Sequence, residues 1–304
     1  MTEKGQSGDV IFITTHDGNS LYLVNEDVKL LAYGNLGAPS TQFITRRGYL
    51  QNGQTEVAYT LSPRTISVEL WRSPACDRQT YWDTRKELHD YLRPNRNGPM
   101  IFTIQTPNGN QRSIVVRADP GLTFPSQSNN NNWNIQEPMD FLANDPTFFD
   151  AVQTVSALSS STQTQLVFPI TFPITFGTSD VFLTTGAFIY AGTWKTYPII
   201  TITGPYTRAN IQHVELGINI ALSVAIGAGE QRIIDLTPGS QSITDASGNN
   251  KFSDLGAGSD LVDFAIYPDP EVAGGVQTIT VQLVGGTPGV SATTLSYYSR
   301  YFAL

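Results

Sequence analysis

Hydrophobic residues recur along most of this chain with the alternating period of β-strands. In residues 65–71 (TISVELW), Ile66, Val68 and Leu70 alternate with polar residues and so share one face of a strand. Five later segments read as strands in the same way: 196–204, 213–224, 231–239, 261–268 and 276–286. Strands at such regular spacing predict a mainly β protein built from sandwiches or barrels.

Two segments of the first half predict β-hairpins. Residues 9–24 hold two apolar runs around the sequence HDGN, and residues 100–116 hold two around PNGN. Glycine and asparagine adopt the backbone conformations that a tight chain reversal needs. Both hairpins belong to the half of the chain that also carries the single helical pattern.

That helical pattern spans residues 78–92. Four apolar residues lie near one face of the predicted helix: Tyr81, Leu88, Tyr91 and Leu92. Four charged residues lie elsewhere around it: Asp83, Lys86, Glu87 and Asp90. Pro94 cannot continue a helix, because it lacks the backbone N–H and clashes with the preceding turn. We interpret the helix as packed on a sheet; docking of a partner through an outward-facing Trp82 and Tyr91 is the alternative.

The composition changes near residue 150, which predicts a domain boundary. Residues 152–165 are rich in Ser, Thr and Gln, as linkers are. In FPITFPITF (residues 168–176), Phe and Ile alternate with Pro and Thr, and proline cannot donate to a strand ladder. This predicts an edge strand or an extended arm. We expect a first domain at 1–151 and a second at 152–304, with an extended linker or arm at 152–178.

Charge and composition exclude several classes of protein. The 304 residues include 14% charged residues, against a typical value of about 25%. The net charge of 18 − 26 = −8 disfavours binding to DNA, because phosphates attract basic surfaces. The single cysteine, Cys76, excludes an internal disulfide. No apolar run suits a secretory leader or a membrane span, so we expect synthesis in a cytoplasm and no membrane insertion.

The search for catalytic, cofactor and metal residues predicts none. The three histidines, His16, His89 and His213, have no partner at metal-ligand spacing, and Cys76 stands alone. There is no nucleophile-elbow motif and no glycine-rich phosphate loop. We therefore expect a protein that is not an enzyme and carries no cofactor.

Four carboxylates and three aromatic residues are the remaining candidates for chemistry. Asp260, Asp263, Asp269 and Glu271 lie close together in the sequence, and a glycosidase needs two facing carboxylates. We interpret these four as turn and surface acids. Trp194, Tyr197 and Tyr206 suit a sugar-stacking platform, although core packing is the simpler interpretation. Residues 127–133 (QSNNNNW) suit a polar binding loop or, more simply, a hairpin tip.

Several motifs in order resemble the distal tail proteins, or Dit family, of long-tailed bacteriophages. The resemblance covers nearly the whole chain. In the first half it rests on RRGYLQNGQTEVAYTLSPRTISVELW, LRPNRNGP, ADPGLTF and MDFLANDPTFFD. In the second half it rests on GTWKTYPIITITGP, GINIAL, IIDLTPG, ITDASGNN, LVDFAIYPDP and YYSRYFAL.

This resemblance implies a structural protein made of two β-sandwiches. The first would carry one packed helix and a long hairpin, and would form a homohexameric ring. The second would be a galectin-like jelly roll. The ring would surround the DNA conduit without binding DNA, and would join the tail tube protein to the tail-tip protein within the virion. Receptor-binding proteins are further candidate partners. A carbohydrate-binding module that attaches the virion to host glycans is the alternative function.

Overall fold

The computed structural model describes residues 9–23, 28–75, 78–93, 98–118, 128–129, 132–162 and 181–304. The chain divides into two compact units. Unit 1 comprises residues 1–151 together with 301–304, and unit 2 comprises residues 152–300. The predicted second domain ran to residue 304, so the structure moves the last four residues into the first unit.

Unit 1 contains eleven strands and one helix among its described residues. They are β1 (Val10–Thr14), β2 (Ser20–Tyr22), β3 (Val28–Gly34), β4 (Thr41–Arg46), β5 (Thr55–Leu61), β6 (Arg64–Ala75), α1 (Arg78–Leu92), β7 (Met100–Gln105), β8 (Gln111–Ala118), β9 (Ser128–Asn129), β10 (Asn132–Ala143) and β11 (Phe148–Asp150). Seven of the strands form one antiparallel path in the order β2-β1-β7-β8-β10-β6-β3. The predicted hairpins are confirmed as β1–β2 and β7–β8.

The core of unit 1 is formed mainly by side chains of the strands in this path. Phe102 of β7 and Phe141 of β10 are fully buried, with ring centroids 5.9 Å apart. On β6, Ile66 and Val68 are buried, as the alternation predicts, and face the same core. The side chain of Leu70 lies outside the described set. Alternating apolar residues therefore let one continuous sheet enclose its own core, in the manner of a β-sandwich.

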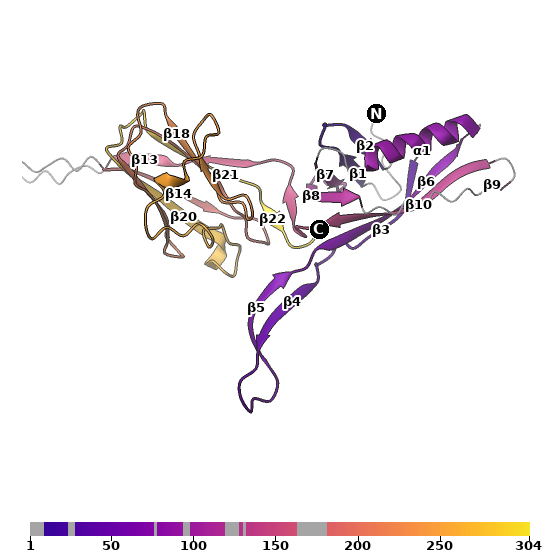
Figure 1. Ribbon diagram of the computed structural model, residues 1–304, viewed down its shortest axis with the longest axis horizontal. Helices are drawn as coiled ribbons and strands as arrows, with labels where there is room; N and C mark the ends of the chain where they lie inside the picture. Colours follow the sequence, from indigo (N-terminus) through magenta and orange to yellow (C-terminus); the bar gives the residue numbers. More distant parts are fainter. Residues whose placement is uncertain are drawn as a thin grey trace, which may run out of the picture. The chain divides into compact units, whose positions relative to one another are not determined.

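Helix α1 is confirmed over the predicted residues and covers part of this core. Leu88 and Leu92 are buried, Tyr91 is half-buried against the core, and Lys86 is exposed. The helix contacts β6 and β10 (Figure 1). The side chain of Tyr81 lies outside the described set, as do residues 94–97 that follow the helix. Trp82 is exposed, as the partner-docking interpretation required, whereas Tyr91 packs inward.

Buried arginine explains why the last four residues join unit 1. Arg64 at the start of β6 is only 2% exposed and donates through Nη2 to the carbonyl of Phe302 at 3.0 Å. The hydroxyl of Tyr301 donates to Asp150 at 3.1 Å. A buried guanidinium needs acceptors for its N–H groups, and the carbonyl of Phe302 in the last segment is one of them. No periodicity in the sequence signals this contact.

Unit 2 contains ten strands and two short 3₁₀ helices among its described residues, and an eleventh strand crosses its boundary. They are β12 (Thr154–Ala157), β13 (Ser159–Thr162), β14 (Val181–Ile189), β15 (Ile199–Thr203), β16 (Arg208–His213), β17 (Ile218–Leu222), β18 (Gln231–Asp235), β19 (Ser242–Thr244), η1 (Phe252–Asp254), η2 (Ala273–Gly275), β20 (Val276–Val284), β21 (Ala292–Tyr297) and the boundary strand β22 (Arg300–Tyr301). Two antiparallel five-stranded sheets run β12-β21-β15-β18-β19 and β13-β14-β20-β16-β17. They enclose one core, which makes unit 2 a β-sandwich.

Part of the predicted linker is instead structured. Strands β12 and β13 pair with the edges of opposite sheets, so the chain changes sheets between them. Leu158, at the change, is buried in the core and lies over Gly186, where any side chain would collide with it. Edge strands tolerate short polar side chains, so a Ser/Thr-rich composition does not distinguish an edge strand from a linker. The predicted arm at 168–176 lies outside the described residues.

A third correction concerns residues 261–268, which are predicted to be a strand. The structure has only an isolated bridge there, between Ile266 and Thr196. Phe264, Ala265 and Ile266 are all buried in succession. Three consecutive inward side chains do not fit the alternation of a strand, so this segment contributes to the core as a loop. Within the described part of the chain, no helix is long and apolar enough to cross a membrane.

Candidate functional site

The most distinctive surface of unit 1 is the hairpin formed by β4 and β5. These two strands pair only with each other and make a separate two-stranded sheet. Figure 1 shows the hairpin extending away from the sheet, on the side opposite to α1. A backbone hydrogen bond from Ser62 to the carbonyl of Ser40, 2.9 Å long, continues the pairing at its base.

Both faces of this hairpin expose large hydrophobic side chains. Tyr49 and Leu50 at the tip are 95% and 84% exposed. Four more are exposed along the strands: Phe43, Ile44, Val57 and Tyr59. An isolated two-stranded hairpin is marginally stable in water, and a contiguous exposed apolar patch marks an interaction surface. The hairpin therefore has the character of a docking element.

The tip of the hairpin is organised by its own hydrogen bonds. The side chain of Gln51 accepts from the backbone N–H of Gly48 at 2.8 Å and donates to the hydroxyl of Thr55 at 2.7 Å. Arg47 donates through Nε to the carbonyl of Gln51 at 3.2 Å. Leu50 adopts a positive φ of 59°, the left-handed backbone conformation that occurs in turns. The tip is thus presented in a defined shape.

The structure disperses the residues that the sequence marked for chemistry. His16 lies in the β1–β2 turn and His89 on α1, both exposed, while His213 is buried in unit 2. Cys76 lies outside the described residues. Among the residues that the structure describes, no group of three or more His, Cys, Asp or Glu side chains is arranged to hold a metal ion.

Two of the four carboxylates in residues 260–271 accept hydrogen bonds from the backbone of turns. Asp260 accepts from the backbone N–H groups of Val262 and Asp263, each at 3.0 Å. Asp269 accepts from the N–H of Gly274 at 2.9 Å. Asp260 and Asp269 are therefore turn acids, and Asp263 and Glu271 are exposed, which agrees with the interpretation made from the sequence.

The three aromatic candidates do not form one platform. Tyr206 is 1% exposed and belongs to the core of unit 2, so it cannot stack on a sugar. Trp194 and Tyr197 are half-buried, and Tyr197 packs against the same core. In the loop at 127–133, Ser128 and Asn129 pair with the start of β10, and the other tip residues lie outside the described set.

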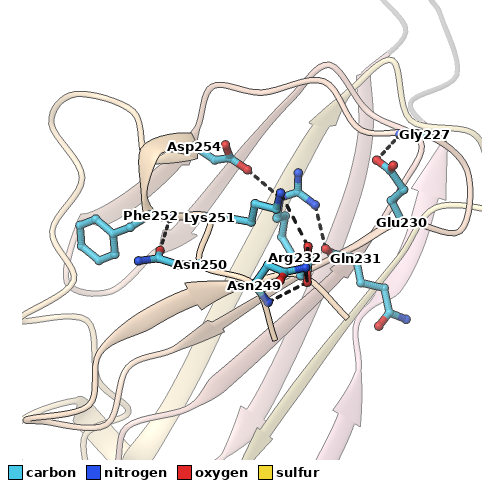
Figure 2. Close-up of polar contacts among 10 residues, drawn as sticks. Gly227, Glu230, Gln231, Arg232, Asn249, Asn250, Lys251, Phe252 and Asp254 are labelled. Atoms are coloured by element: carbon cyan, nitrogen blue, oxygen red, sulfur yellow. Dashed lines mark hydrogen bonds and ion pairs between the residues drawn. The ribbon is translucent and has the colours of Figure 1, made fainter. Parts of the chain in front are cut away.

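Unit 2 instead contains a buried ion pair that the sequence does not reveal. Arg232 on β18 donates through Nε to Asp254 of η1 at 2.7 Å, and both side chains are largely buried. Nη1 of Arg232 also donates to the carbonyl of Gln231 at 3.0 Å (Figure 2). Next to this pair, Lys251 lies 3.6 Å from Asp245. The carboxylate of Asp245 accepts hydrogen bonds from the side chain of Asn249. These hydrogen bonds are the largest cause of the lowered pKa of Asp245.

A second buried polar group of unit 2 is His213, at the end of β16. Its Nε2 lies 2.8 Å from the Gln277 side-chain oxygen and its Nδ1 lies 3.4 Å from Glu215. Burial lowers the pKa of His213, although the contacts with Gln277 and Glu215 act in the opposite direction. The net effect favours the neutral imidazole in the folded state.

This shift predicts that unit 2 loses stability in mild acid. The unfolded imidazole, with a pKa near 6.5, takes up its proton at a higher pH than the folded one. The contribution of His213 is therefore complete above about pH 6.5 and declines as the pH falls toward the folded pKa. The protection factors of the β16 and β20 amides, which are corrected for the intrinsic exchange rate, should decrease as the pH falls from about 7.5 to 5.5. The variant His213→Gln should flatten this dependence, and an equal slope in both proteins would contradict the assignment.

Comparison with solved structures finds chains with a fold similar to this one. No protein-family model matches the sequence, and no curated protein matches it. The chain is similar to the Dit protein of phage SPP1, described as a paradigm of the hub adsorption apparatus in phages that infect Gram-positive bacteria. The TM-score is 0.63 at 11% identity, covering 96% of this chain and 99% of that chain.

A chain of the baseplate of phage P2 is also similar. That structure shows the baseplate in its activated conformation with Ca, with a TM-score of 0.52 and 11% identity. The match covers 95% of this chain and 97% of that chain. The chain therefore has the Dit-type fold along nearly its whole length, as the sequence motifs predicted.

Proposed function

We propose that this protein is a structural component of a bacteriophage tail. Copies of unit 1 form a hexameric ring that joins the tail tube to the tail-tip proteins, in a role without catalysis. The observation that carries the proposal is the match to SPP1 Dit over nearly all of both chains. The description of that protein as part of a hub adsorption apparatus supports a location in the virion tail.

The exposed hairpin β4–β5 supports assembly of several copies. Its apolar side chains are exposed in the single chain. A partner that covers them would stabilise the assembly, since each buried Å² of apolar surface contributes about 25 cal/mol. The hairpin and α1 lie on opposite sides of unit 1 (Figure 1). A contact that joins one side of a copy to the opposite side of the next copy is heterologous, and it must close into a ring or grow into a filament. A closed ring is the form that fits a particle of defined size.

Removing the apolar tip should abolish the ring and spare the fold. We expect the wild-type chain to give hexamers in native mass spectrometry and the variant Tyr49→Ser/Leu50→Ser to give monomers. Both side chains are almost fully exposed, so their loss should change the free energy of unfolding by no more than about 0.5 kcal/mol. Val262→Ser is the matched control, because it removes an exposed apolar side chain from unit 2. Hexamers that survive the tip variant would contradict the role of the hairpin.

The intact particle provides the second test of this function. A cryo-microscopy reconstruction should show the chain as a ring between the tail tube and the tip. Single copies on a fibre, or a trimer, would overturn the proposal. With a net charge of −8 the ring should let DNA pass without binding it.

A further inference from the structure

An asparagine followed by a glycine lies in the turn between β4 and β5. Asn52 and Gly53 fall between the ends of the two strands, and both residues are exposed. Gly53 has a positive φ of 82°, and apart from its chain neighbours no atom lies within 4 Å of the position that a Cβ would take. Glycine adopts this conformation freely and leaves its backbone nitrogen without a shielding side chain. The side-chain amide of Asn52 and the nitrogen of Gly53 are therefore accessible to each other and to water.

These two groups have no hydrogen bond that holds them in place. Within the described part of the chain, neither the side chain of Asn52 nor the backbone N–H of Gly53 has a hydrogen-bond partner. The side chains of Gln51 and Gln54, on either side of the pair, are each held by hydrogen bonds within the turn. The turn is thus fixed on both sides of Asn52 and Gly53, while the pair itself keeps its freedom to rearrange.

A second pair of this kind, Asn108 and Gly109 in the β7–β8 turn, is held by hydrogen bonds. Gly109 also has a positive φ, 88°, and open space in place of a side chain. Its N–H, however, donates to the carbonyl of Thr106 at 2.9 Å. The side-chain oxygen of Asn108 accepts from the backbone N–H of Asn110 at 3.2 Å and from the hydroxyl of Thr106. The third Asn-Gly pair, at residues 97–98, includes a residue outside the described set.

We propose that Asn52 is a modification site, at which the side chain deamidates spontaneously with water as the co-reactant. A base removes the proton from the Gly53 backbone N–H, and the nitrogen attacks Cγ of Asn52. The new bond between this nitrogen and Cγ closes a succinimide ring. The bond from Cγ to the side-chain nitrogen breaks, and that nitrogen takes up a proton and leaves as ammonia. Water then opens the ring at either of its two carbonyls, which gives aspartate or isoaspartate.

The hydrogen bonds of the β7–β8 turn oppose the same reaction at Asn108. There the N–H of Gly109 must leave its carbonyl acceptor, and the asparagine side chain must leave its two donors. No such contact has to break at Asn52. We therefore expect reaction at Asn52 to be at least about tenfold faster, or about 1.4 kcal/mol in activation free energy, which is the scale of one net hydrogen bond. Each event replaces a neutral amide with a carboxylate, so the charge of residues 46–54 falls from +2 to +1.

Peptide mapping by mass spectrometry tests the site in the folded, full-length chain. After incubation in mildly alkaline buffer, Asn52 should be converted to a much greater extent than Asn108. Hydroxylamine opens a succinimide and breaks the chain there, so it should release fragments of 52 and 304 − 52 = 252 residues. The variant Asn52→Gln keeps a neutral amide but closes the larger ring far more slowly, and it should abolish both signals. The tip variant Tyr49→Ser/Leu50→Ser, which is expected not to assemble, is mapped in parallel so that another copy cannot conceal the site.

Unfolding the chain separates the effect of the structure from that of the flanking sequence. In concentrated urea both turns are lost, so Asn52 and Asn108 should react at similar rates. A preference for Asn52 that persists in urea would show that neighbouring residues set it, and would overturn the structural inference. Equal conversion of the two asparagines in both folded chains would overturn the site itself. The proposed role in the tail is decided separately, by the reconstruction of the intact particle.

Discussion

Replacing Asp254 with alanine should lower the free energy of unfolding of unit 2 by about 3–5 kcal/mol. The substitution leaves the guanidinium of Arg232 largely buried without its carboxylate partner, which lies 2.7 Å away in the folded chain. A buried charge without a partner is costly, because the interior cannot replace the water that the group has lost. Hydrogen exchange of the β15 and β18 amides under native conditions reports the loss in the full chain.

Two further variants identify the cause of this loss. Asp263→Ala removes an exposed carboxylate from the same unit and should change the free energy of unfolding by no more than about 0.5 kcal/mol. The double variant Arg232→Met/Asp254→Leu removes both charges and should be more stable than Asp254→Ala alone. Equal destabilisation by the single and double variants would show that packing, and not the stranded charge, sets the cost.

Replacing Leu88 with aspartate should destabilise unit 1 by about 3 kcal/mol or more. Leu88 is 6% exposed on the inner face of α1, so the new carboxylate would be buried without a partner. Lys86→Ala, two residues earlier on the exposed face, should change the free energy of unfolding by no more than about 0.5 kcal/mol. Chemical denaturation followed by far-ultraviolet circular dichroism compares the two variants. Equal shifts in the unfolding midpoint would mean that α1 does not pack through the assigned face.

Elements with strong periodicity were predictable from the sequence. The face of β6 that carries Ile66 and Val68 and the face of α1 that carries Leu88 and Leu92 follow directly from their spacing. The β1–β2 and β7–β8 hairpins follow from turn residues between two apolar runs. In each case the local pattern and the packed core require the same arrangement, so no knowledge of distant contacts is needed.

Features that depend on distant contacts were not predictable. The apolar run at 261–268 looks like a strand, but in the structure it is a loop whose Phe264 packs in the core of unit 2. The polar strands β12 and β13 form because each pairs with the outer strand of a different sheet. The docking character of the β4–β5 hairpin was also hidden. Its side chains alternate like those of any strand, and only the structure shows that both faces are exposed.

Contacts of charged groups with distant parts of the chain were also hidden in the sequence. Arg64 and Phe302 lie 238 residues apart, and nothing in that spacing indicates the hydrogen bond between them. The buried pair of Arg232 and Asp254 likewise joins a strand to a 3₁₀ helix through space. Pairing of charged groups across a fold depends on the path of the chain, which short-range patterns do not encode.

The return of residues 301–304 to unit 1 makes unit 2 an insertion within the first unit. A single cut at either junction would leave unit 2 attached through the other one. A chain truncated before residue 301 would lose the carbonyl that Arg64 contacts and the hydroxyl that Asp150 contacts. Exchange of residues 152–300 for another domain would therefore succeed only if the terminal segment is kept. A fluorescent label attached at residue 304 would accordingly mark unit 1, although this residue follows unit 2 in the sequence.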